Sequence, residues 1–424
     1  MRLRMILACF GLCATAGSAA ADSTETVLHR FAGRQGGDGA FGGYESPTYG
    51  GLVADGLGNF YGTTLYGDND TGNPTRCDDG NQPFACGTAF ELSPPSAPGA
   101  LWTETIIYSF GHSNRTDGTL PTGGLAIRDG VLYGSTMDSQ RVGYGTIFQL
   151  TPPLRPGDPW TQTILHNFGR PHGTGPDGTV PNGSVVMDAA GNIYGTTQDG
   201  GDYGYGTVWE LSPPSRPGNA WKEQILYSFG TASDDGHTPR GGVILDDSGN
   251  LYGTTYVGAR GYGDLYELSP SGTGTWTHKL LYSFTGLSDG GQPVGSLAFN
   301  GPDIYGAGAG GVFQFSAGVS TVINPIQASA GVIFDTAGNL YGTAFTQGGF
   351  NLGSVFELSP SGTPGTWTLT TLYSFAGGLD GANPQSGVVF GQGADLFGLT
   401  NAGGISDCVA PVYGGCGVVF QIVN

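Results

Sequence analysis

A tandem repeat constrains this chain more than any other feature of its sequence. Its clearest element is the string Gly-Asn-Leu-Tyr-Gly-Thr-Thr at residues 249–255. The aromatic position of this string recurs seven times along the chain, at Tyr61, Tyr133, Tyr194, Tyr252, Tyr305, Tyr341 and Phe397. A string that recurs many times along a chain, at intervals of several tens of residues, indicates a fold built from copies of one supersecondary unit.

Each copy contains four short segments that are typical of β-strands. They are an apolar segment such as 241–246, the repeat string itself, a segment such as 206–212 and a closing segment such as 225–229. All four kinds are rich in β-branched and aromatic residues and are bounded by Gly, Pro, Asn or Asp. Four strands per copy predict an all-β fold, a seven-bladed β-propeller with four antiparallel strands in each blade.

The two ends of the chain hold complementary parts of one copy. Residues 26–31 have the closing-segment pattern but follow no earlier blade, and the last copy stops after its third strand at 418–422. We therefore expect the N-terminal strand to complete the last blade, which closes the ring and removes exposed strand edges. Residues 22–424 are predicted to form this one domain.

Residues 1–21 differ from the repeats. Arg2 and Arg4 precede an apolar run from 5 to about 16, and alanines follow at 19–21. This is the layout of a secretory signal peptide, so we expect a secreted or periplasmic protein. No later apolar run is long enough to predict a membrane helix. We expect a monomer that does not insert into a membrane.

Charge narrows the range of partners. The chain has 34 acidic and 15 basic residues, for a formal net charge of -19. An acidic protein of this kind is a poor partner for nucleic acid. Glycine accounts for 80 residues while aromatic residues make up 11% of the chain, which indicates glycine-rich turns between aromatic strands rather than disorder.

The repeat strings resemble a known family. The strings Leu-Tyr-Gly-Thr-Thr at 251–255, Gly-Thr-Val-Trp-Glu-Leu-Ser at 206–212 and Leu-Tyr-Ser-Phe at 226–229 are similar to those of the GloVer tandem-repeat family of bacterial exported proteins. The resemblance covers residues 26–424. It implies export and a repeated β-structure, and it implies no particular reaction or ligand.

A group of acidic residues recurs in the connections between copies. An Asp-Gly pair shortly before a proline occurs at Asp117, Asp177, Asp235, Asp289 and Asp380, and a looser version at Asp38. We expect these connections on one face around the axial opening, where gathered carboxylates would bind calcium, another cation or a hydroxyl-rich ligand. The alternative is that each carboxylate only bonds to backbone amides of its own turn.

Three histidines lie in the same connections. They are His112, His172 and His237, and the last two are the candidate catalytic residues, as a general base or a metal ligand. His29 and His166 align instead with tyrosines of the closing strands, such as Tyr108, so we interpret them as packing residues.

Aromatic residues in the loops between second and third strands form a second group. Tyr203, Tyr205 and Tyr262 are the candidates for stacking on a carbohydrate, and Tyr66, Tyr256 and Phe350 lie in equivalent loops. Tryptophans that precede closing strands are interpreted differently, as wedges between the outer parts of neighbouring blades. These are Trp102, Trp160, Trp221, Trp276 and Trp367.

Four cysteines follow the predicted signal peptide, and an even number in an exported chain indicates disulfides. Cys77 and Cys86 lie in one long loop, and Cys408 and Cys416 lie in another. We expect local pairing within each loop. A bridge from Cys86 to Cys416 is the alternative, because the first and last blades are neighbours.

Two functions are consistent with these features. The first is an exported, non-catalytic binding or scaffold propeller whose acidic loop-bearing face engages an extracellular glycan or protein. The second is an exported polysaccharide lyase or glycoside hydrolase that uses His172 or His237, a loop tyrosine and one aspartate on the same face. Propellers support both kinds of function, so the fold does not decide between them.

Overall fold

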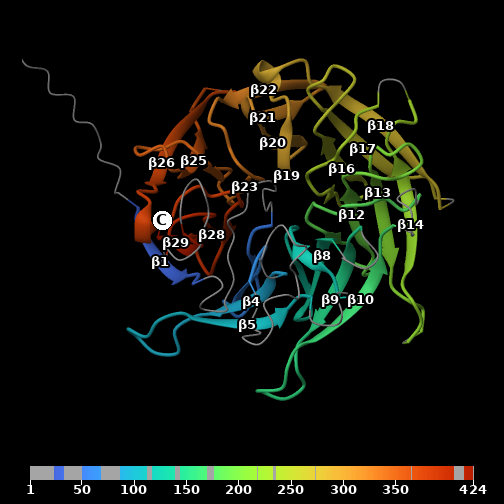
Figure 1. The fold of residues 1–424 in the computed structure, drawn as a ribbon. Coiled ribbons are helices and arrows are strands. Elements are labelled where there is room, and N and C mark those ends of the chain that lie inside the picture. The colour runs from blue at the N-terminus through green and yellow to red at the C-terminus, as the bar shows by residue number, and fades with distance from the viewer. Residues whose placement is uncertain are drawn as a thin grey trace, which may run out of the picture.

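The computed structural model describes residues 23–32, 50–67, 86–111, 117–138, 144–169, 176–216, 218–232, 235–272, 274–363, 365–404 and 415–423. These residues form seven separate antiparallel sheets arranged around a central axis (Figure 1). The predicted seven-bladed β-propeller is therefore confirmed. The predicted signal peptide, residues 1–21, lies outside the described residues.

The strands of each blade follow one another from the axis outward. Blade one consists of β2 (Val53–Ala54), β3 (Phe60–Thr64), β4 (Thr88–Ser93) and β5 (Thr103–Ser109). In blade two, β6 (Thr119–Pro121) and β7 (Ala126–Arg128) both pair with β8 (Val131–Asp138), which β9 (Thr146–Thr151) and β10 (Thr161–Asn167) follow. Blade three consists of β11 (Val186–Met187), β12 (Ile193–Thr197), β13 (Thr207–Ser212) and β14 (Lys222–Ser228).

The remaining blades repeat this order. Blade four consists of β15 (Ile244–Leu245), β16 (Leu251–Thr255), β17 (Asp264–Pro270) and β18 (Trp276–Ser283). Blade five consists of β19 (Pro293–Asn300), β20 (Asp303–Gly308), β21 (Gly311–Ser316) and β22 (Val319–Asn324). Blade six consists of β23 (Ile333–Phe334), β24 (Leu340–Ala344), β25 (Ser354–Pro360) and β26 (Trp367–Ser374).

Blade seven is built from both ends of the chain. It contains β27 (Val389–Phe390), β28 (Leu396–Leu399), β29 (Val418–Val423) and, as its outermost strand, β1 (Thr24–Arg30). β1 pairs antiparallel with β29 from Thr24 opposite Val423 to Arg30 opposite Val418. Figure 1 shows the blue β1 beside the red β29. The expected ring closure is therefore present, and Phe31, which directly follows β1, is fully buried.

The hydrophobic core lies between neighbouring blades. One cluster, for example, joins Tyr194 and Val208 of blade three to Tyr266 and Leu268 of blade four. The glycine of the repeat string allows this packing, because a Cβ atom on Gly195 would lie only 2.4 Å from the ring of Trp209 on the adjacent strand. A side chain in place of this glycine would displace the third-strand aromatic residue from the core.

The tryptophans before the outer strands contact the preceding blade, which is the predicted wedge arrangement. The ring centroids lie 5.8–6.4 Å apart in the pairs Trp102–Phe397, Trp160–Tyr61, Trp221–Tyr133, Trp276–Tyr194 and Trp367–Tyr305. Aromatic pairs at this separation add stabilisation beyond their buried area.

Helices make up almost none of the described structure. They are two single 3-10 turns, η1 (Leu287–Asp289) and η2 (Gly378–Asp380), in the connections into blades five and seven. Neither these turns nor anything else described here provides a helix of the length and apolarity needed to cross a membrane.

Candidate functional site

The carboxylates of the Asp-Gly pairs lie at the junctions between blades. At four junctions the hydroxyl of an outer-strand tyrosine donates a hydrogen bond to the aspartate of the connection that follows. The pairs are Tyr108–Asp117 at 2.9 Å, Tyr227–Asp235 at 2.6 Å, Tyr282–Asp289 at 3.1 Å and Tyr373–Asp380 at 2.6 Å. Each of these hydrogen bonds links the aspartate of a connection to the outer strand of the blade before that connection.

Backbone amides of the same turns complete this arrangement. The Asp235 carboxylate accepts the N–H groups of Gly230 and Thr231, both at 3.0 Å, and Asp289 accepts that of Thr285 at 2.8 Å. Burial acts to raise the pKa of Asp289, but hydrogen bonds from Thr285 and its neighbours outweigh burial and lower it. The Asp289 carboxylate is therefore stabilised as an anion inside its own turn.

The expectation that the aspartates gather at the axial opening is wrong. The hydrogen bonds hold them beside outer strands, and Asp117 is only 3% exposed. The five aspartates Asp117, Asp177, Asp235, Asp289 and Asp380 occupy five separate junctions and share no calcium site, while Asp38 lies outside the described residues. The geometry favours the turn-forming alternative, and a ligand-binding role for these residues stays a prediction.

A backbone hydrogen bond also fixes each of these connections between blades, at the residue just before its proline. The residue there has a left-handed backbone although it is not glycine, with φ of 58° at Leu120, 58° at Val180, 61° at Thr238, 55° at Gln292 and 54° at Asn383. Its N–H donates to a carbonyl in the loop between the second and third strands of the preceding blade, as from Thr238 to Tyr205 at 3.0 Å. Each connection is thus attached to a neighbouring loop.

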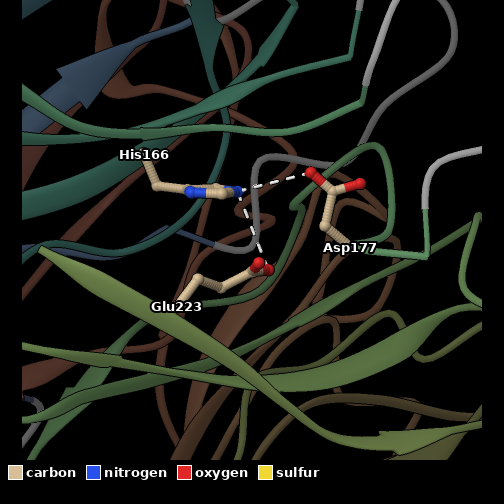
Figure 2. Close-up of side chains that lie close together, drawn as sticks. All are labelled: His166, Asp177 and Glu223. Carbon is tan, nitrogen blue, oxygen red and sulfur yellow. Dashed lines mark ion pairs between the residues drawn. The ribbon is translucent and has the colours of Figure 1, made fainter.

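The junction between blades two and three departs from this pattern. His166 of β10 replaces the tyrosine, and its Nε2 atom lies 3.6 Å from Asp177 and 3.7 Å from Glu223 of β14. Figure 2 shows the imidazole between the two carboxylates. One ligand atom from each side chain lies within 4.8 Å of the others, and this is the one group of three potential metal ligands found among the described residues.

The surroundings affect the two carboxylates differently. Burial raises the pKa of Glu223 to about 7, with a further contribution from Asp177 and an opposing one from His166. Burial also acts to raise the pKa of Asp177, but His166 and the backbone amides of the turn lower it. Aligning His166 with the tyrosines missed this cluster. The available signal was the coincidence of histidine at 166 with glutamate at 223, in place of tyrosine and glutamine at the preceding junction.

The predicted catalytic residue His237 gains no catalytic partner among the described residues. His237 lies against the Tyr205 ring at a centroid distance of 5.1 Å, and its Nδ1 atom is 3.0 Å from the Thr238 hydroxyl. Its backbone forms two hydrogen bonds with Val257. His112 and His172 lie outside the described residues. So do Cys77 and Cys408, and although Cys86 and Cys416 are buried, the disulfide pairing stays a prediction.

The loop tyrosines divide into exposed and packed residues. Tyr203 is 52% exposed, Tyr205 47% and Tyr262 37%, so their rings are accessible, and their role in stacking on a carbohydrate stays a prediction. Tyr66 instead packs against the core between blades seven and one. Tyr256 lies under a guanidinium, because Arg240 sits 3.7 Å from the centroid of its ring. Tyr256 also lines a pocket.

This pocket lies on the loop-bearing face of blades four to six. It has a volume of about 290 Å³. Its aromatic wall is Tyr256 and Phe345, and its polar lining comes from Gln292, Gln327, Ser329, Thr346 and Gln385. Gln327 donates to the carbonyl of Ala309 at 3.2 Å, and Asn401 donates to the carbonyl oxygen of Gln385. Among the described residues, the pocket lining carries amide, hydroxyl and aromatic groups and no carboxyl, imidazole or guanidinium group.

The pocket forms because blade five has a short loop. β20 ends at Gly308 and β21 begins at Gly311, so only Ala309 and Gly310 connect them. In blade four the corresponding loop runs from 256 to 263 and in blade six from 345 to 353. The connection at blade five therefore leaves a space that the longer loops on both sides enclose. The short connection is visible in the sequence, but the pocket is not, because its lining comes from several other segments of the chain.

Comparison with known proteins places these features in context. No curated protein matches the chain in sequence. One similar solved structure is a putative oxidoreductase (glucose dehydrogenase) from Thermus thermophilus, 15% identical with a TM-score of 0.44, which covers 95% of this chain and 100% of that chain. Another is the Trypanosoma rangeli sialidase in complex with 2,3-difluorosialic acid, 11% identical with a TM-score of 0.41, covering 95% of this chain and 58% of that chain.

A third similar structure is a luciferin-regenerating enzyme, 13% identical with a TM-score of 0.43 and coverage of 95% of both chains. In sequence, the model of the Gloeobacter/Verrucomicrobia repeat matches residues 77–312, which is more than half of the chain. This agrees with the family predicted from the repeat strings. The chain belongs to the Gloeobacter/Verrucomicrobia repeat family.

Proposed function

We propose that this protein is an exported, non-catalytic binding propeller that recognises an extracellular glycan through the pocket between blades four and six. The observation that carries the proposal is the lining of that pocket. It combines the aromatic rings of Phe345 and Tyr256, the second with one face covered by Arg240, with three primary amides and two hydroxyls. Such a lining suits a ligand that is rich in hydroxyl groups and carries no charge.

The amides provide directional contacts for sugar hydroxyls. Each glutamine side chain has two N–H donors and one carbonyl acceptor. Gln327 donates one N–H to the carbonyl of Ala309, and the side-chain oxygen of Gln385 accepts from Asn401, so each side chain is held by one hydrogen bond and keeps N–H donors for a ligand. Side chains held in this way lose little conformational entropy on binding.

The same lining argues against the hydrolase or lyase alternative at this position. Glycoside hydrolysis generally uses two carboxyl groups that flank the scissile bond. The described residues that line the pocket include none, and His237 lies instead against Tyr205. The exposed Tyr203, Tyr205 and Tyr262 extend the aromatic surface over blades three and four, so a longer glycan chain would contact them next.

Export is a separate part of the proposal. It rests on the predicted signal peptide at residues 1–21 and on the resemblance to exported proteins. Expression of the full-length chain in a bacterium, followed by N-terminal sequencing of the extracytoplasmic fraction, tests this part. Cleavage near residue 21 supports export, whereas an intact N-terminus in the cytoplasm contradicts it.

Binding is tested by glycan-array screening of the purified protein, followed by calorimetry with the best neutral oligosaccharide. We expect the double variant Gln327→Ala/Gln385→Ala to weaken binding about 10-fold or more, because each lost amide contact is worth about 1 kcal/mol. Gln224→Ala is the matched control, since Gln224 is a glutamine on the outer strand of blade three that donates to the carbonyl of Gly274 and lies outside the pocket lining.

Two outcomes contradict the proposal. Equal affinity of the wild type and the double variant would show that the glycan binds elsewhere. A change in oligosaccharide size, detected as new reducing ends or as an unsaturated product, would support the enzyme alternative instead. The array and the product analysis use the same preparation, so binding and cleavage are measured under the same conditions.

A further inference from the structure

The junction between blades two and three contains buried polar atoms without hydrogen-bond partners. They are Nε2 of His166, Oδ1 of Asp177 and Oε1 of Glu223. At the four tyrosine junctions the hydroxyl donates directly to the aspartate at 2.6–3.1 Å. Here the imidazole nitrogen stops 3.6 Å from Asp177, which is too far for a hydrogen bond. Buried polar atoms in a folded protein normally have a hydrogen-bond partner or a bound ion, so we expect these three atoms to have one as well.

The spacing of the three side chains matches that of ligands around a single metal ion. With metal–ligand bonds of about 2.0–2.1 Å, neighbouring ligand atoms of a tetrahedral ion lie about 3.4 Å apart. The Nε2 atom of His166 lies 3.6 Å from Asp177 and 3.7 Å from Glu223, and all three ligand atoms lie within 4.8 Å of one another. The two distances from His166 exceed this spacing by only a few tenths of an ångström, and the carboxylate ligand atoms lie within 4.8 Å of each other.

The chemistry of the donors selects the class of ion. An imidazole with two carboxylates suits a transition ion such as Zn²⁺, whereas Ca²⁺ takes six to eight oxygen ligands. Two carboxylates balance the charge of a divalent cation, which makes its partial burial favourable. The side chains of the three residues are only 16–19% exposed, so protein surrounds most of the cluster.

We propose that His166, Asp177 and Glu223 form a three-ligand site for a divalent transition metal ion, with Zn²⁺ as the best-fitting ion and water as the fourth ligand. The ion connects β10, the connection that follows it and β14. It therefore joins the outer strands of blades two and three, in the place that a tyrosine hydroxyl bonded to the aspartate takes at four other junctions. This metal site is independent of the proposed glycan pocket, which lies in blades four to six.

The alternative occupant is a proton. A protonated His166 between two carboxylates would form ion pairs at the same positions, with no metal involved. The two cases differ in their response to a chelator and to added Zn²⁺, because an ion-paired imidazolium must lose its proton before it can bind a metal.

The test uses the purified full domain without an affinity tag, treated with a chelator and then titrated with Zn²⁺ against a chromophoric competitor. We expect one tight equivalent and a rise in Tm of about 3 °C at saturating zinc. Co²⁺ in place of Zn²⁺ should give the visible absorption of a four-coordinate ion. His166→Tyr should weaken the affinity for zinc by about 100-fold or more, because removing even a supporting group of a metal site can cost that much.

The residues found at the other blade junctions indicate which variants of this site are compatible with the fold. Tyrosine stands at the His166 position at four junctions, and Gln162 stands at the Glu223 position, so His166→Tyr and Glu223→Gln should both fold. Conversely, Tyr108→His/Gln162→Glu should create a second site with Asp117 and raise the stoichiometry to two.

Three results overturn the proposal. One is a wild type that binds no zinc after chelator treatment, which is the ion-pair outcome. Another is an unchanged zinc affinity in folded His166→Tyr and Glu223→Gln proteins, which places the zinc elsewhere. The third is a folded Tyr108→His/Gln162→Glu protein without a second equivalent, because the three residue types at this geometry would then be insufficient.

Discussion

Replacing Glu25 by glutamine should stabilise the protein at alkaline pH and have a smaller effect at mildly acidic pH. Glu25 lies on β1 at the junction of blades six and seven, where Tyr373 donates to Asp380. Its Oε1 atom is buried without a hydrogen-bond partner. The equivalent residue of β10 is Gln162, which donates to the backbone of Asp117 at 2.8 Å, so glutamine is compatible with a junction of this kind.

The size of the stabilisation expected for Glu25→Gln follows from the pKa of the Glu25 carboxyl group. Burial, and after it the Asp380 carboxylate, raise the pKa of Glu25 from 4.5 to about 7, while Arg30 opposes them. The folded protein therefore keeps a proton that the unfolded chain has released, and stability falls as pH rises from 4.5 to about 7. The full shift corresponds to about 3 kcal/mol, and solvent screening of this half-buried group reduces it to about 1–2 kcal/mol.

Urea denaturation followed by tryptophan fluorescence provides the assay. Between about pH 5.5 and pH 8, the free energy of unfolding of Glu25→Gln should rise relative to wild type by about 1 kcal/mol. The reverse change, Gln162→Glu, is the matched control and should lose stability over the same interval, because it places a carboxylate beside Asp117. A difference between Glu25→Gln and wild type that does not change with pH would refute the reasoning.

Three further predictions concern the closure of the ring, the backbone of one connection and the disulfides. Deleting β1 should lower the free energy of unfolding by about 5 kcal/mol or prevent folding, because it exposes the edge of β29 and removes apolar cover; urea denaturation measures this, and an unchanged midpoint contradicts it. Val180→Asn should stabilise by about 1 kcal/mol, since asparagine accepts a left-handed backbone better than a β-branched residue and stands at this position before blade seven; a lower Tm would contradict this. Peptide mapping without reduction should recover Cys77 linked to Cys86 and Cys408 linked to Cys416, and a Cys86–Cys416 peptide would reject local pairing.

The sequence was sufficient to predict the fold because each blade repeats the same local pattern. The string around Tyr252 marks a second strand wherever it occurs, and the unpaired closing segment at 26–31 indicated that the N-terminus completes the ring. Trp160 was also interpreted correctly, because an aromatic residue at a fixed place in every copy must meet a fixed partner, here Tyr61. Local periodicity carries this information without knowledge of distant contacts.

The junctions could not be predicted in the same way, because each one combines residues from two copies. His166 and Glu223 are 57 positions apart, and neither is unusual within its own strand (223 − 166 = 57). The placement of Asp117 depended on the backbone at Leu120, whose positive φ attaches the connection to the neighbouring loop. The pocket depends on the shortness of the 308–311 connection, and its lining comes from six different segments of the chain.

The most direct test of the proposed function is a crystal structure of the protein with the neutral oligosaccharide that binds best on the array. We expect an intact sugar chain in the pocket, with one ring against Tyr256 or Phe345 and hydroxyls within hydrogen-bonding distance of Gln327 and Gln385. A sugar bound away from this pocket, or a cleaved product in the crystal, would contradict the account.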